Sequence, residues 1–263
     1  VLDAVKKAKL PEDEAKREHK LWRHTLGAPK EKDALVYEEK DELFTLGLSK
    51  SRDGKMLFHS SVSFTSTEVR YLPSDVPAGE WKTLLKREPN HEYDADHGDG
   101  TFYIRTNKGA TNFKVVTCPV AKPEVANWSD LMPYDPKVYV EGVAAFKGRV
   151  VLSARVGGLA TLIVRDLASG QSYPIGFGDK PHDVTLGNNP EYDAPALRLT
   201  YTSLTDPDAV YEHDFATRKN KPLKVKEVPG GYNPADYVAE RVHAVAPDGT
   251  RVPISLVYKK GLK

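Results

Sequence analysis

Four short apolar stretches recur at an almost constant spacing along the chain, and this period constrains the fold more than any other feature. GKMLFHSS, TFYIRTN, RVVLSAR and LRLTYTS begin at Gly54, Thr101, Arg149 and Leu197, which are 47, 48 and 48 residues apart. Each stretch is rich in the β-branched, aromatic and aliphatic residues that favour strands. Such a period indicates one small structural unit that is built several times.

Each repeat predicts four strands. One extended run precedes each of these stretches, and two more follow it after polar turns; the third runs begin at Thr67, Asn112, Ala160 and Ala209. Four short strands per repeat are typical of β-propeller blades, whereas a β-sandwich would have similar turns without the regular recurrence. KLWRHTLG and DALVYEE predict a partial unit before the repeats, so the sequence predicts an all-β propeller segment of about four and a half blades.

The C-terminal region predicts a hairpin. Two runs in which apolar and polar residues alternate flank Asp248-Gly249, a strong turn signal. The apolar positions of these runs are Val242, Ala244, Ala246, Val252, Ile254, Leu256 and Tyr258. We expect a hairpin from Tyr237 to Tyr258 whose apolar face is left uncovered, because the sequence ends soon afterwards. We therefore expect the chain to be an internal piece of a longer protein, in which the hairpin opens a further domain.

Charge and composition argue against two classes of partner. The 38 basic and 37 acidic residues are interspersed and give a net charge of +1, which does not suit a nucleic-acid footprint. No apolar run approaches the ~18 residues of a membrane span. The charged residues 1–20 predict a helical or disordered segment, with Pro11 near a helix start. The single cysteine, Cys118, lies in the apolar KVVTCPV and predicts a buried thiol in a reducing, cytoplasmic compartment.

Known catalytic and phosphate-binding motifs are absent: the sequence holds no G-x-S-x-G, G-x-x-x-x-G-K-[ST] or H-E-x-x-H. The densest polar cluster is NHEYDADHGDG. Along a strand, His91 and His97 would lie ~20 Å apart, too far to share one metal ion. The calcium-loop pattern counted from Asp94 fails at its fifth and twelfth positions. We expect a solvated strand end with a turn at Gly98–Gly100, no metal site and no cofactor.

Several stretches together resemble a known family. They are DALVYEEKDELF, HEYDADHGDGTFYIRTNKGATNFKV, GLATLIV, LRLTYTSLTDPDAVYEHD and KEVPGGYNPADYVAERVHAVAPDGTRVPISLVYKKG. The resemblance is to the oligopeptidase B branch of the prolyl oligopeptidase family of serine peptidases. It extends from about Leu21 to Gly261 and is strongest in the last seventy residues.

The resemblance implies a seven-bladed propeller that covers an α/β-hydrolase domain. A Ser-Asp-His triad of that second domain would cut short peptides after Lys or Arg, and the propeller would exclude folded proteins. Residues 21–230 would then be the later blades, and residues 231–263 the linker and first β-hairpin of the peptidase domain. The upstream blades and the remaining hydrolase domain would be its missing partners. The triad lies in that missing part, so no catalytic residue is assigned to this chain.

Charges on inner strands and at strand ends are the candidate site residues. We expect Glu141, Arg155 and Arg198 to line the tunnel or to contact the hydrolase domain. Arg155 ends a predicted strand before a Gly157-Gly158 turn, where an arginine either forks onto a carboxylate or lies free on the surface. Two other functions stay open. A free-standing propeller would act as a protein-interaction scaffold, and a related family member would prefer proline; in either case no nucleic acid or membrane partner is expected.

Overall fold

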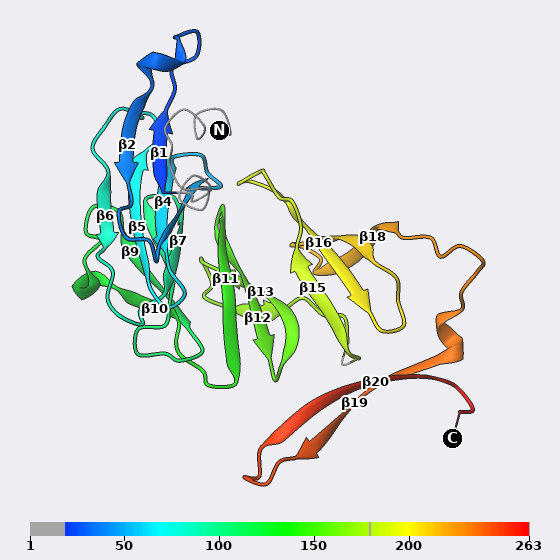
Figure 1. Ribbon diagram of the computed structural model, residues 1–263. Helices are drawn as coiled ribbons and strands as arrows, with labels where there is room; N and C mark the ends of the chain where they lie inside the picture. The colour runs from blue at the N-terminus through cyan, green and yellow to red at the C-terminus, as the bar shows by residue number, and fades with distance from the viewer. Residues whose placement is uncertain (1–18, 179, 263) are drawn as a thin grey trace.

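Four sheets of the protein repeat one plan. The structure, a computed structural model, describes residues 19–178 and 180–262, so the predicted segment 1–20 lies almost entirely outside the described residues. Each of the four sheets has four antiparallel strands that pair in chain order. We call these sheets blades 1 to 4, and Figure 1 shows them fanned out in an open arc. The prediction of an all-β propeller segment is confirmed.

The strand bounds agree closely with the predicted repeat. Blades 1 and 2 consist of β3 (Thr45–Lys50), β4 (Met56–Val62), β5 (Thr67–Pro73), β6 (Lys82–Leu85), β7 (Tyr93–Gly98), β8 (Thr101–Thr106), β9 (Lys114–Pro119) and β10 (Ser129–Met132). Blades 3 and 4 consist of β11 (Val138–Phe146), β12 (Arg149–Val156), β13 (Leu159–Asp166), β14 (Ser172–Pro174), β15 (His182–Leu186), β16 (Ala196–Ser203), β17 (Ala209–Asp214) and β18 (Lys219–Val225).

Two smaller sheets flank the blades. The predicted partial unit is the pair β1 (Lys20–Arg23) and β2 (Ala34–Glu38), and the predicted hairpin is the pair β19 (Tyr237–Val245) and β20 (Arg251–Lys259). Short 3-10 turns occupy Lys30–Lys32 (η1), Val125–Asn127 (η2) and Pro234–Asp236 (η3). The proposed division of the chain near residue 230 falls in the linker before η3 and stays a prediction.

The core lies between blades rather than inside one sheet. Strand β12 shows why: Val150 and Leu152 pack toward blade 2, whereas Val151 packs toward blade 4. A strand that is buried on both faces needs consecutive apolar residues. Strand β16 alternates instead, because only one face of blade 4 is covered: Leu197, Leu199 and Tyr201 are buried, and Arg198 and Thr200 are exposed.

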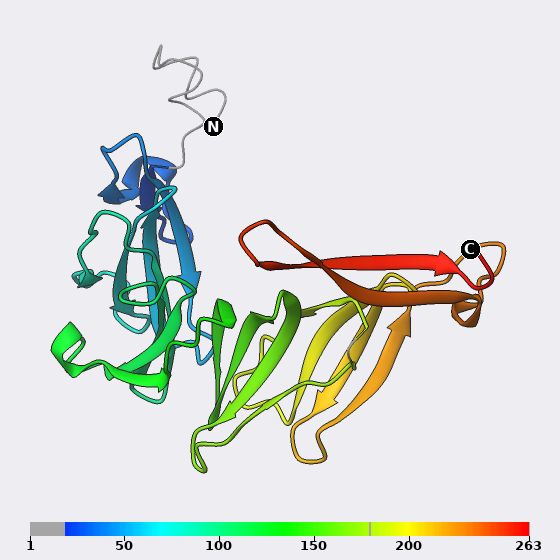
Figure 2. The same ribbon diagram turned by 90° about the horizontal axis from the view of Figure 1, so that it is seen from below.

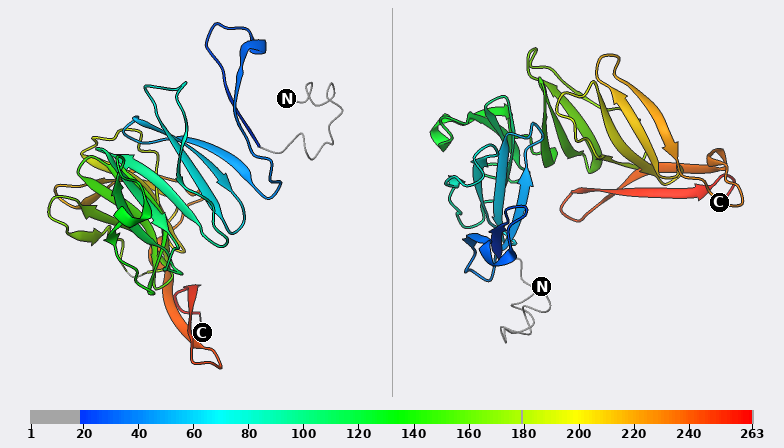
Figure 3. Two further views of the ribbon diagram at one scale, coloured as in Figure 1. Left: turned by 90° about the vertical axis from the view of Figure 1, so that its left-hand side faces the viewer. Right: turned by 90° about the horizontal axis from the view of Figure 1, so that it is seen from above.

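The hairpin lies across one end of blades 3 and 4, as Figure 2 shows (orange to red); Figure 3 gives the same arrangement from two other sides. We call this end of the blades, where β12 turns into β13 and β16 into β17, the hairpin end. The opposite end, where β11 turns into β12 and a long loop joins β15 to β16, is the far end. Strand β20 is exposed along its whole length.

Candidate functional site

The hairpin contacts the turn between β12 and β13. The Arg241 guanidinium on β19 donates a hydrogen bond to the carbonyl oxygen of Gly157. A side chain at Gly158 would place its Cβ 3.0 Å from Arg241 Nη2 and 3.7 Å from Pro253 Cγ. Both glycines also have positive φ, at +56° and +81°, which glycine adopts at little cost. The predicted Gly157-Gly158 turn is therefore confirmed, and it admits the hairpin because it carries no side chains.

Two of the three candidate site residues meet directly beside this turn. Arg155 Nε donates a hydrogen bond to Glu141 Oε1 over 2.7 Å. Glu141 is the extra residue of a β-bulge, since Val140 pairs with Ala154 and Gly142 with Ser153. A bulge redirects a side chain, and here it brings the carboxylate to the arginine. Both side chains are partly exposed, so the pair contributes little to stability.

The third candidate residue, Arg198, lies elsewhere. It sits near the start of β16 at the far end, and its carbonyl oxygen accepts hydrogen bonds from Gly187 N and Asn189 Nδ2 of the β15–β16 loop. Its side chain is exposed. The structure therefore does not group Arg198 with Glu141 and Arg155, and its assignment as an interdomain residue stays a prediction with no contact behind it.

A second contact joins the linker to blade 4. The Tyr232 hydroxyl donates to the carbonyl oxygen of Thr205, in the turn between β16 and β17. Next to this bond, residues of blade 4 and the linker enclose a cavity of about 380 Å³. Asn233 then caps the short turn that leads into the hairpin by accepting from Ala235 N. The hairpin is therefore attached to the hairpin end at Gly157 and at Thr205.

A polar cavity of about 520 Å³ lies where the first strands of the blades converge. Its lining comes from β3 and the β3–β4 turn, β7, β11 and the loop after β15, so the first strands of blades 1 to 3 meet at this cavity. Asp96 accepts from the main-chain nitrogens of His97 and Ala145, each over 2.8 Å. Arg52 lies over the Phe146 ring, 4.4 Å from its centre. Burial raises the pKa of Asp96 and lowers that of Arg52.

This axial cavity was not predicted from the sequence, where Asp96 counted only as part of a polar cluster without a metal site. The available signal was the repeat itself, because Asp96 belongs to the first strand of a blade and inner strands line the axis of a propeller. The expected peptide path was instead assigned to Glu141, Arg155 and Arg198, as charges on inner strands and at strand ends.

The expectation of a solvated strand end around His91 and His97 is wrong. Both imidazoles are buried, at 4% and 2% exposure, because neighbouring blades pack against β7. His91 Nε2 lies 2.8 Å from Thr106 Oγ1. His97 Nδ1 lies 2.9 Å from Asp53 Oδ2 of blade 1, which makes the pair a link between two blades. The predicted turn at Gly98–Gly100 is present, with positive φ at Asp99 and Gly100.

Cys118 is buried in the core between blades 1 and 2, as predicted. Burial raises the pKa of its thiol to about 11, so the group is an inert core side chain at neutral pH. In the part of the chain that the structure describes, no three His, Cys, Asp or Glu side chains gather in a way that would hold a metal ion. Within the same residues, no helix has the length and apolar character needed to cross a membrane.

The consecutive four-stranded sheets, packed face to face around a common axis, define the class: this is a β-propeller segment with an attached hairpin. The sequence profile described as "Prolyl oligopeptidase, N-terminal beta-propeller domain" matches residues 3–226. Because this match covers most of the chain, the chain belongs to the prolyl oligopeptidase family. The resemblance inferred from the sequence is thereby confirmed.

Individual relatives agree with this assignment. The chain is similar to dipeptidyl aminopeptidase BI of Pseudoxanthomonas mexicana, with 41% identity over 239 residues, 90% of this chain and 33% of the relative. It is 30% identical to Protease 2 of Moraxella lacunata over 250 residues, 95% of this chain and 36% of the relative. The solved oligopeptidase B from Trypanosoma brucei with covalently bound antipain superposes with a TM-score of 0.85 at 33% identity, over 95% of this chain and 37% of that one. The chain thus spans about a third of the length of these relatives.

Proposed function

We propose that this chain is the substrate-gating propeller of a serine peptidase that cuts short peptides after Lys or Arg. One observation carries the proposal: a hairpin with exposed apolar side chains lies across the end of the blades, in a chain whose relatives are peptidases about three times as long. In this proposal the hydrolase domain covers the hairpin, and peptides reach it along the axis of the propeller. Catalysis resides in that domain.

The Glu141–Arg155 pair would act as a positioning element at the domain boundary. Arg155 stands two residues before Gly157, whose carbonyl oxygen Arg241 of the hairpin contacts. Closure of a domain over a site typically sequesters substrate and sets access rather than the chemical step. The buried thiol of Cys118 supports placing the protein in a reducing compartment, the cytoplasm.

The substrate preference has two candidates. The preference for Lys or Arg rests on the 33% identity to the Trypanosoma brucei oligopeptidase B, whereas the 41% identity to a dipeptidyl aminopeptidase favours removal of dipeptides from a free N-terminus. Two fluorogenic substrates separate them in the intact protein. One carries arginine before the scissile bond and a blocked N-terminus, and the other is a dipeptide with a free amine. Cleavage of only the free-amine substrate would overturn the first preference.

The function itself is tested by treating the native protein with a serine-directed phosphonate and measuring its intact mass. A labelled species well above the mass of this chain is expected, since the nucleophile belongs to the hydrolase domain. An unlabelled species with the mass of this chain alone would overturn the proposal and favour a propeller that serves as a free-standing interaction scaffold.

A further inference from the structure

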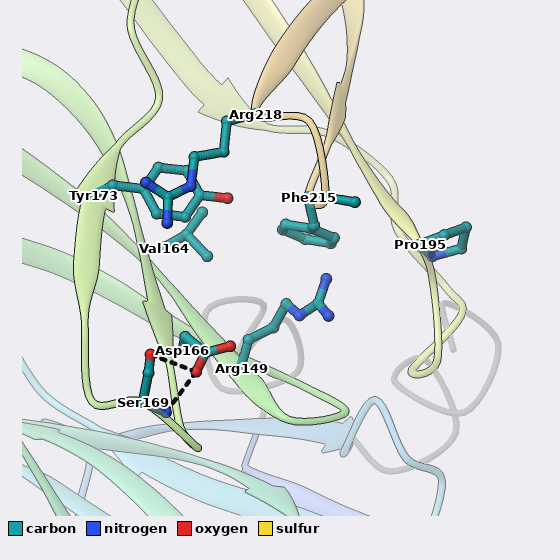
Figure 4. Close-up of a pocket in the computed structure, with 9 residues that line it drawn as sticks. Arg149, Val164, Asp166, Ser169, Tyr173, Pro195, Phe215 and Arg218 are labelled. Atoms are coloured by element: carbon teal, nitrogen blue, oxygen red, sulfur yellow. Dashed lines mark hydrogen bonds between the residues drawn. The ribbon is translucent and has the colours of Figure 1, made fainter.

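A cavity of about 380 Å³ opens between blades 3 and 4 at the far end. Two arginines, Arg149 and Arg218, line it together with one carboxylate, Asp166, as Figure 4 shows. Arg149 begins β12 and the hairpin contacts the turn after this strand ends, so roughly 23 Å of strand separates the cavity from the hairpin. The cavity is therefore distinct from the proposed domain boundary, and it shares no lining residue with the axial cavity.

Both arginines depart from the repeat that builds the two blades. The turn after β13 runs from Asp166 to Gly170, and the turn after β17 runs from Asp214 to Arg218. In each, the aspartate carboxylate accepts from the residue three positions on, and its carbonyl oxygen accepts from the N–H four positions on. The last position has positive φ in both, +69° at Gly170 and +56° at Arg218. At this position of the turn, blade 4 therefore has arginine where blade 3 has glycine.

Arg218 therefore occupies a left-handed backbone conformation that L-residues other than asparagine and aspartate rarely adopt. A residue held in such a conformation is a pointer to function when its side chain has a specific destination. That destination is the cavity, where the guanidinium lies over the Tyr173 ring at 4.3 Å.

Arg149 departs from the repeat in the same way. It pairs across the sheet with Asp166, whereas the residue that pairs with the equivalent Asp214 in blade 4 is Ala196. Its guanidinium lies over the Phe215 ring at 4.1 Å. The Nη1 atom is buried and has no hydrogen-bond partner. Two substitutions of the repeat, one in each blade, thus bring two guanidinium groups to one cavity.

The charges of this cavity are not balanced by the protein. Asp166 is the one acidic residue of the lining against two arginines, and its Oδ1 already accepts from Ser169 N and Oγ, each over 2.7 Å. Among the described residues, neither Arg149 nor Arg218 forms an ion pair. The aromatic rings cover the faces of the guanidinium groups, which leaves their N–H edges available. The buried Nη1 of Arg149 lacks an acceptor, which is costly unless an anion supplies one, whereas Arg218 is exposed and its N–H groups are open to the same anion.

We propose that this cavity binds a tetrahedral oxyanion of the phosphate class. A guanidinium presents a planar fork of donors that matches oxyanions, and here two forks come from two different blades. A single carboxylate offers its two oxygens in one plane to one fork, whereas a tetrahedral oxyanion has acceptors in several directions. The cavity volume lies at the lower end of the range for small-ligand sites, which suits inorganic phosphate or a small phosphorylated molecule.

The test is titration of the intact protein with inorganic phosphate, sulfate and acetate by calorimetry. Saturable binding of phosphate and sulfate is expected, with acetate weaker by roughly tenfold or more, since it leaves one guanidinium without its hydrogen bonds. Absence of saturable phosphate binding at millimolar concentration would overturn the proposal, and so would acetate that binds as tightly as phosphate.

Four variants assign the binding to these residues. R149Q and R218Q are each expected to weaken phosphate roughly tenfold or more. R198Q removes the same charge from an exposed arginine at the same end of the blades and is expected to bind phosphate normally. R218G restores the residue of the repeat; it should weaken phosphate in the same way while the melting temperature without phosphate stays equal or rises. A fall of that melting temperature, with phosphate binding intact, would mean that Arg218 only holds the blades together.

Discussion

The blades and the hairpin use similar strands in opposite ways. Strands in blades 2 and 3 bury apolar residues on both faces because a neighbouring blade covers each face, and Phe102, Leu152 and Leu162 are fully enclosed. The strands of the hairpin alternate just as clearly, yet Val242, Ile254 and Leu256 remain about 38% exposed. The alternation of apolar and polar residues therefore specifies a strand, whereas the burial of its apolar face depends on what packs against it.

The largest effect expected from this comparison is the loss of a core side chain. Phe102→Ala should lower the free energy of unfolding by about 3–5 kcal/mol, because it opens a cavity between blades 1 and 2. Ile254→Ala on the hairpin should cost less than about 1 kcal/mol, because that side chain is already partly in water. Urea unfolding of the 263-residue chain measures both.

The same two variants, measured in the intact protein, report whether a further domain covers the hairpin. If a hydrolase domain covers the hairpin, Ile254→Ala should lower the free energy of unfolding of the intact protein by nearly as much as truncation of a core side chain does, about 2–5 kcal/mol. If Phe102→Ala and Ile254→Ala lowered the free energy of unfolding of the 263-residue chain equally, the hairpin would already belong to a core and the contrast with the blades would be wrong.

A smaller effect comes from a buried histidine of blade 1. His59 is 1% exposed and lies between the rings of Tyr37 and Trp81. Burial, together with the positive charge of Arg70, lowers its pKa from 6.5 to about 4. Between these pH values the unfolded chain binds the proton and the folded chain does not. Stability is therefore full above pH 6.5 and falls as the pH drops toward 4, by roughly 3 kcal/mol.

Urea midpoints at neutral pH and near pH 4.5 measure this fall. His59→Phe should remove much of it, whereas His243→Gln, an exposed position on the hairpin, should leave it unchanged. Glu39 acts in a separate window. Burial alone would raise its pKa, but the hydrogen bond and charge of Arg87 outweigh burial and lower the pKa to about 2, so its contribution is lost only between pH 4.5 and 2. A pH slope that survives His59→Phe above pH 4.5 would assign it elsewhere.

The attachment of the hairpin should be weaker than the cohesion of the blades. Arg241→Ala removes the bond to Gly157 and should loosen the hairpin by about 1 kcal/mol without changing global stability. Hydrogen exchange of the β19 and β20 amides should become faster while that of β12 stays the same. Arg251→Ala removes an equal charge from the tip of the hairpin and serves as control. Unchanged exchange after Arg241→Ala would mean that the linker alone holds the hairpin.

The propeller architecture was predictable from the sequence because its signal is repeated. Strand β5 was predicted at the bounds observed, Thr67–Pro73, and the other third strands within about two residues, because apolar runs and turn residues recur at one period. Contacts between blades have no such signal. His97 and Asp53 are distant in the sequence and meet only when blade 2 packs on blade 1. The pattern around His91 therefore suggested a solvated strand although both histidines are buried.

The candidate site was predictable only in part for the same reason. Arg155 and Glu141 were chosen as charges at a strand end and on an inner strand. A β-bulge that the sequence pattern did not predict brings their side chains together. Arg198 was chosen on the same grounds but lies at the far end of its blade. Neighbouring strands run in opposite directions, so the sequence of a strand does not show which end of the sheet a given residue reaches. The axial cavity could not be predicted, because its lining comes from four blades whose relative placement the sequence pattern does not give.

The smallest effect on stability, and the one closest to function, concerns Arg155. Its bond to Glu141 is exposed, so Arg155→Ala should change the free energy of unfolding by less than about 0.5 kcal/mol. If the proposed peptidase domain is attached in the intact protein, the same change should relax the proposed size limit on peptides, because the arginine stands beside the turn that the hairpin contacts. Cleavage rates for a matched series of short and long peptides measure this, with Arg198→Ala at the far end as control. The ratio of the cleavage rates of long and short peptides should rise only for Arg155→Ala. Equal ratios in both variants would mean that the Glu141–Arg155 pair has no gating role and that other contacts of the hairpin form the domain boundary.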